Sequence, residues 1–202
     1  MTEHFNTIRL AGEALSAPVF DHEAFGEAFY SFRLSVPRLS GARDALPVTV
    51  SEALLSDVRI EAGAPVGIAG QIRSYNRRAE DGSHLVITVF ARAARPLAEC
   101  EPWMNDAQMT GRICRPVVYR TTPFSREISD ILVAVGRRYG RSDYIPCIAW
   151  GRSARFAGGL MPGDTVAIRG RLQSREYQKT LPDGESEQRI AYELSCSSIE
   201  LI

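Results

Sequence analysis

The sequence predicts an all-β protein made of two similar domains in tandem. The main observation is an internal repeat, in which an alternating pattern of five residues recurs about 100 residues later along the 202-residue chain. The pattern consists of Val66, Ile68, Gly70, Ile72 and Ser74 in the first half and of Val166, Ile168, Gly170, Leu172 and Ser174 in the second. A repeat of this length corresponds to a whole domain rather than to one unit of a solenoid. With a hydrophobic content of 45%, the chain is long enough for two domains, each with its own core.

Alternation of apolar and polar residues predicts five strands in each half. The predicted strands are Thr7–Gly12, Tyr30–Val36, Leu46–Val50, Val66–Ser74 and Leu85–Ala91, then Asn105–Gly111, Ile131–Val135, Tyr144–Trp150, Thr165–Tyr177 and Arg189–Ile199. Each half has one short helix candidate between its third and fourth strands: Ala53–Val58, with Ser51 as its N-cap, and Ser153–Leu160. This layout is that of the OB-fold, a small five-stranded Greek-key barrel. We therefore expect two tandem OB-fold barrels, residues 1–95 and 105–202, joined by a linker at 96–104.

Composition and charge restrict the expected location of the protein in the cell and the classes of partner that it can bind. No stretch approaches the roughly 18 apolar residues of a membrane helix, and the N-terminus does not resemble a signal peptide, so we expect a cytoplasmic protein without a membrane partner. The four cysteines lie far apart in the sequence, and Cys147 is expected to be a small buried hydrophobe. The formal net charge is zero, but residues 1–104 carry ten Lys/Arg and thirteen Asp/Glu, whereas residues 105–202 carry fourteen and eleven. The excess positive charge therefore lies in the second half.

Two strands of the second half separate into an inward and an outward face, because alternate side chains on a strand share a face. On Tyr144–Trp150 the pattern places Ile145, Cys147 and Ala149 inside and Tyr144, Ile148 and Trp150 outside. On the strand that begins at Thr165 the outward positions are Arg169, Arg171, Gln173, Arg175, Tyr177 and Lys179. Exposed aromatic rings beside cations are what single-stranded nucleic acid requires, since bases stack on the rings and cations neutralise phosphates. A solvated hairpin with a core Trp150 is the simpler alternative, which the two outward aromatic residues of the neighbouring strand disfavour.

The first half keeps a reduced copy of this pattern. Its outward positions are Gln71, Arg73, Tyr75 and Arg77, of which Tyr75 is a stacking candidate and Arg73 and Arg77 are phosphate-binding candidates. The positions that match Tyr144 and Trp150 are Ala45 and Ser51. We therefore expect the first barrel to bind more weakly or to serve mainly in assembly.

Several motifs of the second half, in order, resemble the bacterial single-stranded DNA-binding protein family. They are Gly111-Arg-Ile, Ile131-Leu-Val-Ala-Val, Arg137-Arg-Tyr-Gly, Asp143-Tyr-Ile-Pro-Cys-Ile-Ala-Trp-Gly, Ala154-Arg-Phe-Ala, Gly163-Asp and Gly170-Arg-Leu-Gln-Ser-Arg-Glu-Tyr. The resemblance covers nearly all of residues 106–202, whereas the first half shares only its spacing and one strand pattern. It implies sequence-tolerant binding that protects single-stranded DNA in replication, recombination or repair, on a protein that is nucleoid-associated when bound. The implied stacking residues are Tyr144, Trp150 and Tyr177, and the implied phosphate-binding residues are Arg137, Arg138, Arg169, Arg171, Arg175 and Lys179.

The resemblance also carries expectations about assembly. Members of that family usually have one barrel per chain and form tetramers, so two barrels per chain imply a homodimer that presents four OB-folds. Members usually end in a flexible tail with an acidic tip that recruits partners. This chain ends at Ser197-Ser-Ile-Glu-Leu-Ile, so we do not expect recruitment through such a tail.

Other classes of function fit the sequence less well. We expect no catalytic residues, metal or cofactor, because His4, His22 and His84 are scattered and no phosphate-loop motif is present. Asp143 and Asp164 are interpreted as turn residues rather than as a catalytic pair. An OB-fold protein-interaction module, or a replication-restart assembly factor with secondary nucleic-acid binding, is the alternative. RNA stays open as the ligand, since stacking does not read the 2′-hydroxyl.

Overall fold

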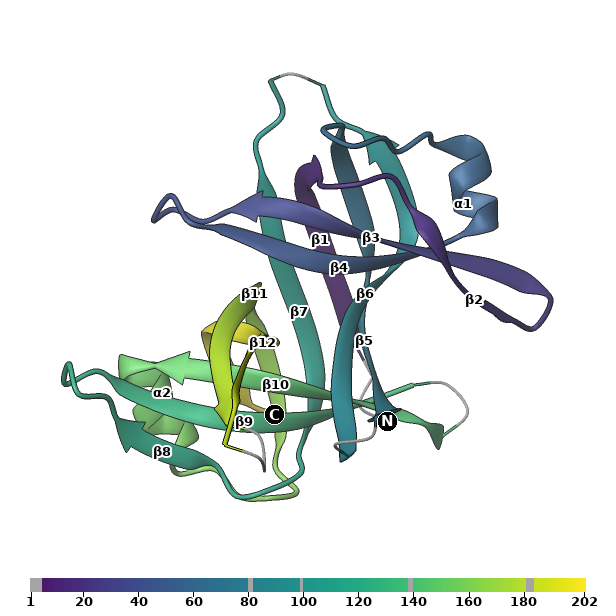
Figure 1. Cartoon of the computed structure of the whole chain (residues 1–202). Helices are drawn as coiled ribbons and strands as arrows, with labels where there is room; N and C mark the ends of the chain where they lie inside the picture. Colours follow the sequence, from purple (N-terminus) through teal and green to yellow (C-terminus); the bar gives the residue numbers. More distant parts are fainter. Residues whose placement is uncertain (1–4, 80–81, 99, 138–139, 181–183) are drawn as a thin grey trace.

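The computed structural model describes residues 5–79, 82–98, 100–137, 140–180 and 184–202, and these residues form two β-barrels (Figure 1). The first barrel contains β1 (Asn6–Ala14), β2 (Val19–Ala24), β3 (Glu27–Pro37), β4 (Arg43–Ser51), α1 (Glu52–Asp57), β5 (Pro65–Ala79) and β6 (Gly82–Pro96). The second contains β7 (Met104–Ile113), β8 (Val118–Thr121), β9 (Glu127–Gly136), β10 (Ser142–Trp150), α2 (Gly151–Ala157), β11 (Thr165–Thr180) and β12 (Ser186–Leu201). Neither helix is long and apolar enough to cross a membrane.

The strand order in each half is that of an OB-fold barrel. In the first half β1, β3, β4, β6 and β5 pair in this order and the barrel closes through β5 and β1. The neighbours β4 and β6 are parallel, whereas the other pairs are antiparallel. The second half repeats this arrangement with β7, β9, β10, β12 and β11. The predicted tandem five-stranded barrels, each with a helix between the third and fourth barrel strands, are confirmed.

Two edge strands lie outside the sequence prediction. β2 pairs with the outer edge of β3, and β8 pairs with β9, so each half has six strands rather than five. Nearly every residue of these two strands is exposed. Because neither strand buries one face, neither shows the alternation of apolar and polar residues by which strands are recognised in a sequence.

The residues of the repeat form the cores of the two barrels. Val66, Ile68 and Ile72 on β5 are at most 2% exposed, and their counterparts on β11 are similarly buried. The repeated glycines, Gly70 and Gly170, mark a register shift between each of these strands and its hairpin partner. A Cβ atom at Gly70 would lie 2.2 Å from the Phe90 carbonyl oxygen, and one at Gly170 would lie 2.2 Å from the Ser195 carbonyl oxygen. The close approach of two backbones therefore explains why both copies have glycine there.

The two helices begin where the third barrel strands end. The Ser51 hydroxyl accepts a hydrogen bond from the Leu54 amide at 3.5 Å, which confirms Ser51 as the N-cap of α1. α2 spans Gly151–Ala157 and begins two residues before the predicted segment, since the left-handed Gly151 (φ 53°) turns the chain directly after β10. Ala154 and Ala157 face the core.

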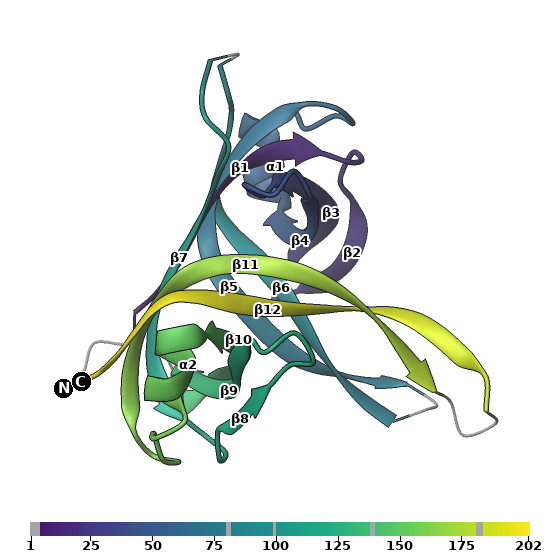
Figure 2. The same cartoon turned by 90° about the vertical axis from the view of Figure 1, so that its left-hand side faces the viewer.

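The barrels are joined by antiparallel pairing of β1 with β7, which makes one continuous sheet of twelve strands over the described residues. Asn6 pairs with Met109, and Leu10 pairs with Asn105. Since Asn105 is the repeat counterpart of Asn6, the two pairs exchange under a local two-fold axis. The geometry is that of a symmetric dimer interface formed within one chain. Figure 2 shows the two long hairpins, β5–β6 and β11–β12, extending to the same side of the molecule.

Gly170→Ala is expected to lower the free energy of unfolding by about 1–3 kcal/mol, because the new methyl group has no space beside the β12 backbone. Gly159→Ala is the matched control, since its Cβ would lie 3.5 Å from the nearest atom, in ordinary contact. Urea denaturation of both variants measures the difference. Equal stability of the two variants would contradict the role assigned to the close approach.

Candidate nucleic-acid interface

The register of β10 places its two predicted aromatic residues on the outward face of the second barrel. Tyr144 and Trp150 are 45% and 42% exposed, whereas Ile145, Cys147 and Ala149 are at most 3% exposed. Neither aromatic ring stacks on another ring within the part of the chain that the structure describes. Both side chains are therefore partly accessible to a ligand.

Ile148 is not exposed, although the sequence pattern assigns it to the outward face of β10. It lies on the same side of β10 as Tyr144 and Trp150 but is only 5% exposed. Asp130 of β9 pairs with it on one side and Ser195 of β12 pairs with it on the other. Neighbouring strands flank this middle position on both sides, whereas Tyr144 and Trp150 lie toward the two ends of the strand. Alternation along a strand predicts the direction in which a side chain points, but it does not predict how far the neighbouring strands bury that side chain.

The outward residues of β11 differ in how freely they are presented. The side chains of Arg169 and Arg175 are 59% and 57% exposed, and Tyr177 is 37% exposed. The Arg175 guanidinium lies 5.7 Å from the centre of the Tyr177 ring, in a cation–π contact. Lys179 lies two residues farther along the same hairpin. Arg171 is half-buried and donates a hydrogen bond to the Pro37 carbonyl of the first barrel at 3.0 Å.

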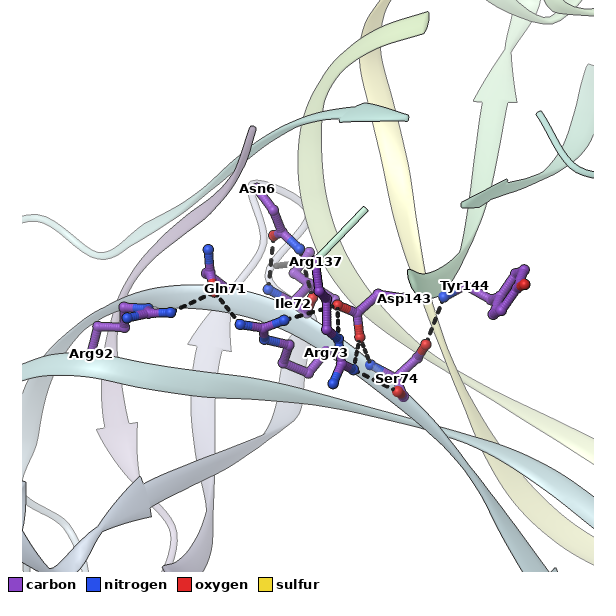
Figure 3. A network of polar contacts seen from close by, with 9 residues as sticks. All are labelled: Asn6, Gln71, Ile72, Arg73, Ser74, Arg92, Arg137, Asp143 and Tyr144. Atoms are coloured by element: carbon purple, nitrogen blue, oxygen red, sulfur yellow. Dashed lines mark hydrogen bonds and ion pairs between the residues drawn. The ribbon is translucent and has the colours of Figure 1, made fainter. Parts of the chain in front are cut away.

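Arg137 is engaged in a contact between the two barrels (Figure 3). It donates to both carboxylate oxygens of Asp143, and its Nη2 also donates to the Ser74 carbonyl at 2.9 Å. The Ser74 amide donates to Asp143 at 2.5 Å, and Arg73 lies 3.3 Å from the same carboxylate. Asp143 is fully buried and lies within β10, so its interpretation as a turn residue is wrong. A buried carboxylate needs such partners, because burial without them is costly.

The same contact recurs in the opposite direction. Arg38 donates to both oxygens of the buried Asp44, at 2.5 and 2.9 Å, and to the Ser174 carbonyl at 2.7 Å. The Ser174 amide and hydroxyl donate to Asp44 at 2.7 and 3.0 Å. Each barrel therefore holds a serine of the other between an arginine and an aspartate. We call the two contacts the Asp143 clasp and the Asp44 clasp.

Three of the predicted phosphate-binding residues are partly buried in contacts between the two barrels. Arg137, Arg73 and Arg171 already have protein partners, and burial lowers the pKa of Arg73 against the opposing effect of Asp143. Arg138 lies outside the described residues. The roles of these four in binding stay predictions. The sequence does contain a signal for the clasps, since both the arginines and the aspartates recur 99 residues apart. However, nothing in this pattern distinguishes an arginine that pairs with a carboxylate from one that binds phosphate.

The first barrel presents its candidates on the β5–β6 hairpin. Tyr75 is 50% exposed, and Arg77 is exposed and has no hydrogen-bond or ion-pair partner within the described parts of the chain. Farther along this hairpin His84 lies 3.3 Å from Arg189 of β12, measured from Nδ1 to Nη1. The two long hairpins therefore touch, which brings outward residues of both barrels to the same side of the molecule (Figure 2).

A carboxylate lies among the outward cations of the second barrel. Glu193 of β12 pairs with Gln173 of β11, and its side chain is 15% exposed. Arg175 lies 3.5 Å away, from Nε to Oε1, and burial raises the pKa of Glu193 despite this partner. Arg169 likewise forms an ion pair with Asp106, at 2.9 Å from Nε to Oδ1. Arg169 and Arg175 are therefore each paired with a carboxylate, which a phosphate would have to replace.

The described residues contain no group of three or more His, Cys, Asp or Glu side chains placed to hold a metal ion. Cys147 is buried at 3% exposure, as predicted for a small hydrophobe. A hydrogen bond with Cys196, together with burial, raises the pKa of the Cys147 thiol. Its thiolate form is therefore disfavoured at neutral pH.

The comparisons with known proteins agree with this geometry. Residues 104–202, which include both β10 and β11, match the Single-strand binding protein family. Residues 104–202, just under half of the chain, therefore belong to this family. The "Single-stranded DNA-binding protein 1" of Staphylococcus aureus (strain COL) is 27% identical over 106 residues, which are 49% of this chain and 61% of that protein. The protein of the same name from Streptococcus pyogenes serotype M18 is 29% identical over 82 residues, 37% of this chain and 63% of that protein.

The chain therefore spans less than two thirds of the length of these relatives. A solved structure extends the likeness to both barrels. The wild-type single-stranded DNA binding protein from Thermus aquaticus superposes with a TM-score of 0.76 at 20% identity, over 98% of this chain and 93% of that chain. A deletion mutant of the same protein gives a TM-score of 0.78 at 19% identity, over 100% and 96%. At this identity the likeness shows the fold, two OB-folds in tandem.

Glu193→Gln is expected to raise the free energy of unfolding at neutral pH. Because the folded-state pKa lies above the ordinary value of 4.5, the ionised carboxylate destabilises the fold at any pH above the raised pKa. This cost disappears as the pH falls below about 4.5. Urea denaturation at pH 7.5 and pH 4 should therefore show a stabilised variant only at the higher pH. The exposed Glu176→Gln is the control, and a pH-independent difference for Glu193→Gln would contradict the assignment.

Proposed function

We propose that this protein binds single-stranded DNA without strong sequence preference, by stacking bases on Tyr144, Trp150 and Tyr177 and by neutralising phosphates with outward cations. The observation that carries the proposal is the pair of exposed aromatic rings on β10 together with the cationic outward face of β11. The two strands are not direct neighbours as the sequence suggested, because β12 lies between them. Membership of residues 104–202 in the Single-strand binding protein family supports it. The names of the relatives from Staphylococcus and Streptococcus point to the same ligand.

Stacking on the aromatic rings is one source of the binding energy in this proposal. Base–aromatic stacking contributes about 1–3 kcal/mol per base and tolerates every base, because each base has a π-face. Tyr144 and Trp150 lie six residues apart on one strand, which is about 20 Å at the usual rise. They would therefore contact different nucleotides rather than one.

The cations contribute unequally. Arg169, Arg175 and Lys179 lie along the outward face of β11, and Arg175 additionally extends the stacking surface of Tyr177. Phosphate would replace Asp106 at Arg169 and Glu193 at Arg175, so each contact exchanges one anionic partner for another. The first barrel, with Tyr75 and Arg77, would form a secondary part of the same surface.

The wider role is protection of single-stranded DNA in replication, recombination or repair, without catalysis, by a cytoplasmic protein that is nucleoid-associated when bound. The unit would be a homodimer that presents four OB-folds, and residues 96–104 would link the two domains of each chain. Light scattering of the purified protein, with and without oligonucleotide, tests the homodimer. A monomer in both conditions would contradict it.

Binding of a poly-dT oligonucleotide is expected to quench the fluorescence of Trp150. Trp103→Phe leaves Trp150 as the sole tryptophan, because the chain has two. Trp150→Ala should weaken binding by about 1–3 kcal/mol, the range for one stacked base. Ser51→Ala, at the matching position of the first barrel, should leave the affinity unchanged. The absence of quenching would overturn the proposed function, and tighter binding of a poly-U oligoribonucleotide would reassign the ligand to RNA.

Arg175→Gln is expected to weaken binding equally for all base compositions and to reduce the slope of log K against log salt by about one. Titrations between 50 and 300 mM NaCl measure the slope. Arg59→Gln is the control, since Arg59 is 88% exposed and paired with Glu61, away from the proposed surface. An unchanged slope for Arg175→Gln would remove Arg175 from the phosphate-binding residues.

A further inference from the structure

One side chain of the first barrel reaches the backbone of the proposed stacking strand of the second. Ser74, near the middle of β5, is 5% exposed, and its hydroxyl oxygen accepts a hydrogen bond from the Tyr144 amide at 2.7 Å. The Tyr144 ring itself points away from the polar network (Figure 3). The contact therefore involves the backbone of Tyr144 and leaves its ring open.

The Ser74 hydrogen bond takes the place of a missing strand neighbour. On one side Tyr144 pairs with Ala134 of β9. On the other side the ladder between β10 and β12 is confined to Cys147 and Ile148, so β12 does not pair with β10 at Tyr144. An amide at such a position needs a partner from elsewhere, and Ser74 provides it.

Ser74 is itself held firmly by the second barrel. Its amide donates to Asp143 at 2.5 Å, and its carbonyl accepts from Arg137 at 2.9 Å. Two of its polar groups thus contact Asp143 and Tyr144 near the start of β10, and the third contacts Arg137, directly after the end of β9. The next residue along β5 is Tyr75, whose ring is 50% exposed. One hydrogen bond therefore connects Tyr144 to Ser74, and Ser74 directly precedes Tyr75, the stacking candidate of the first barrel.

We propose that Ser74 is a positioning residue for Tyr144, so that the first barrel takes part in single-stranded DNA binding through the stacking surface of the second. The proposal rests on the proposed function. It gives the first barrel a role in binding even though Ala45 and Ser51 stand where the second barrel has Tyr144 and Trp150. By fixing the start of β10, Ser74 reduces the conformational freedom that Tyr144 would otherwise lose when a base stacks on it.

The Asp44 clasp provides a matched control within the same chain. Ser174 is held by Asp44 and Arg38 as Ser74 is held by Asp143 and Arg137. Its hydroxyl, however, donates to Asp44, and the residue after Asp44 is Ala45, which has no ring to position. Replacing either serine by alanine removes one hydrogen bond between the barrels, but only Ser74→Ala removes one from Tyr144.

The experiment compares Ser74→Ala with Ser174→Ala in the full chain, with affinity for a labelled dT oligonucleotide measured by fluorescence anisotropy and stability measured by urea denaturation. We expect similar losses of stability, but about 2- to 10-fold weaker binding for Ser74→Ala only, the loss that corresponds to one hydrogen bond. Ser74→Thr, which keeps the hydroxyl, should restore the affinity. In a Tyr144→Ala background, Ser74→Ala should have no further effect on binding. If the role of Ser74 were purely structural, the effects of the two substitutions would add.

The outcomes separate the positioning role from the proposed function. If the wild-type chain binds and both alanine variants lose affinity equally, or if Ser74→Ala and Tyr144→Ala act additively, the positioning role is wrong and the proposed function stands. If the wild-type chain does not bind the oligonucleotide, the proposed function fails and the positioning role fails with it. Should Ser74→Ala not fold, Ser74→Cys replaces it, because sulfur is a weak acceptor of nearly the same size.

Discussion

Two buried carboxylates, Asp44 and Asp143, are the constraint on which the arrangement of the barrels depends. An ionised carboxylate away from water is tolerated only with charged and hydrogen-bonding partners, and breaking such a buried pair typically costs about 3–5 kcal/mol. At both sites one partner is an arginine six residues earlier and the other is a serine of the opposite barrel. Because the partners come from both barrels, both carboxylates have all their partners only at one relative orientation of the two barrels. The same orientation allows β1 to pair with β7.

The duplication has left the two barrels with the same interior and different exteriors. Val66, Ile68 and Ile72 and their counterparts fill equivalent cores, so both halves close into barrels. On the outside, only the second half has aromatic rings at both of the matching β10 positions. A barrel without aromatic residues at these two positions can still hold its neighbour in place, and the reciprocal clasps are contacts of this kind.

Much of the fold was predictable because it depends on local patterns that repeat. Alternation identified the five barrel strands of each half, and the recurrence of Gly70 at Gly170 marked the same backbone contact twice. The edge strands β2 and β8 were not predictable, since an exposed strand has no alternation. The burial of Ile148 was not predictable either, because its cover comes from β9 and β12, which lie on either side of β10 but are distant in sequence.

The sequence alone determined the fold of each half, the direction of the side chains on β10 and β11, and the chemical kind of the proposed surface. These follow from the residues of one strand and from a repeat within one chain. Which cations are exposed and which are partly buried in contacts between the barrels depends on the tertiary structure. Whether Arg137 faces solvent or Asp143 and Ser74 depends on how the barrels meet, and hydrogen bonds between residues more than 60 positions apart have no signature in the local order of residues. Polar contacts across an interface are satisfied in three dimensions, and the clasps are of this kind.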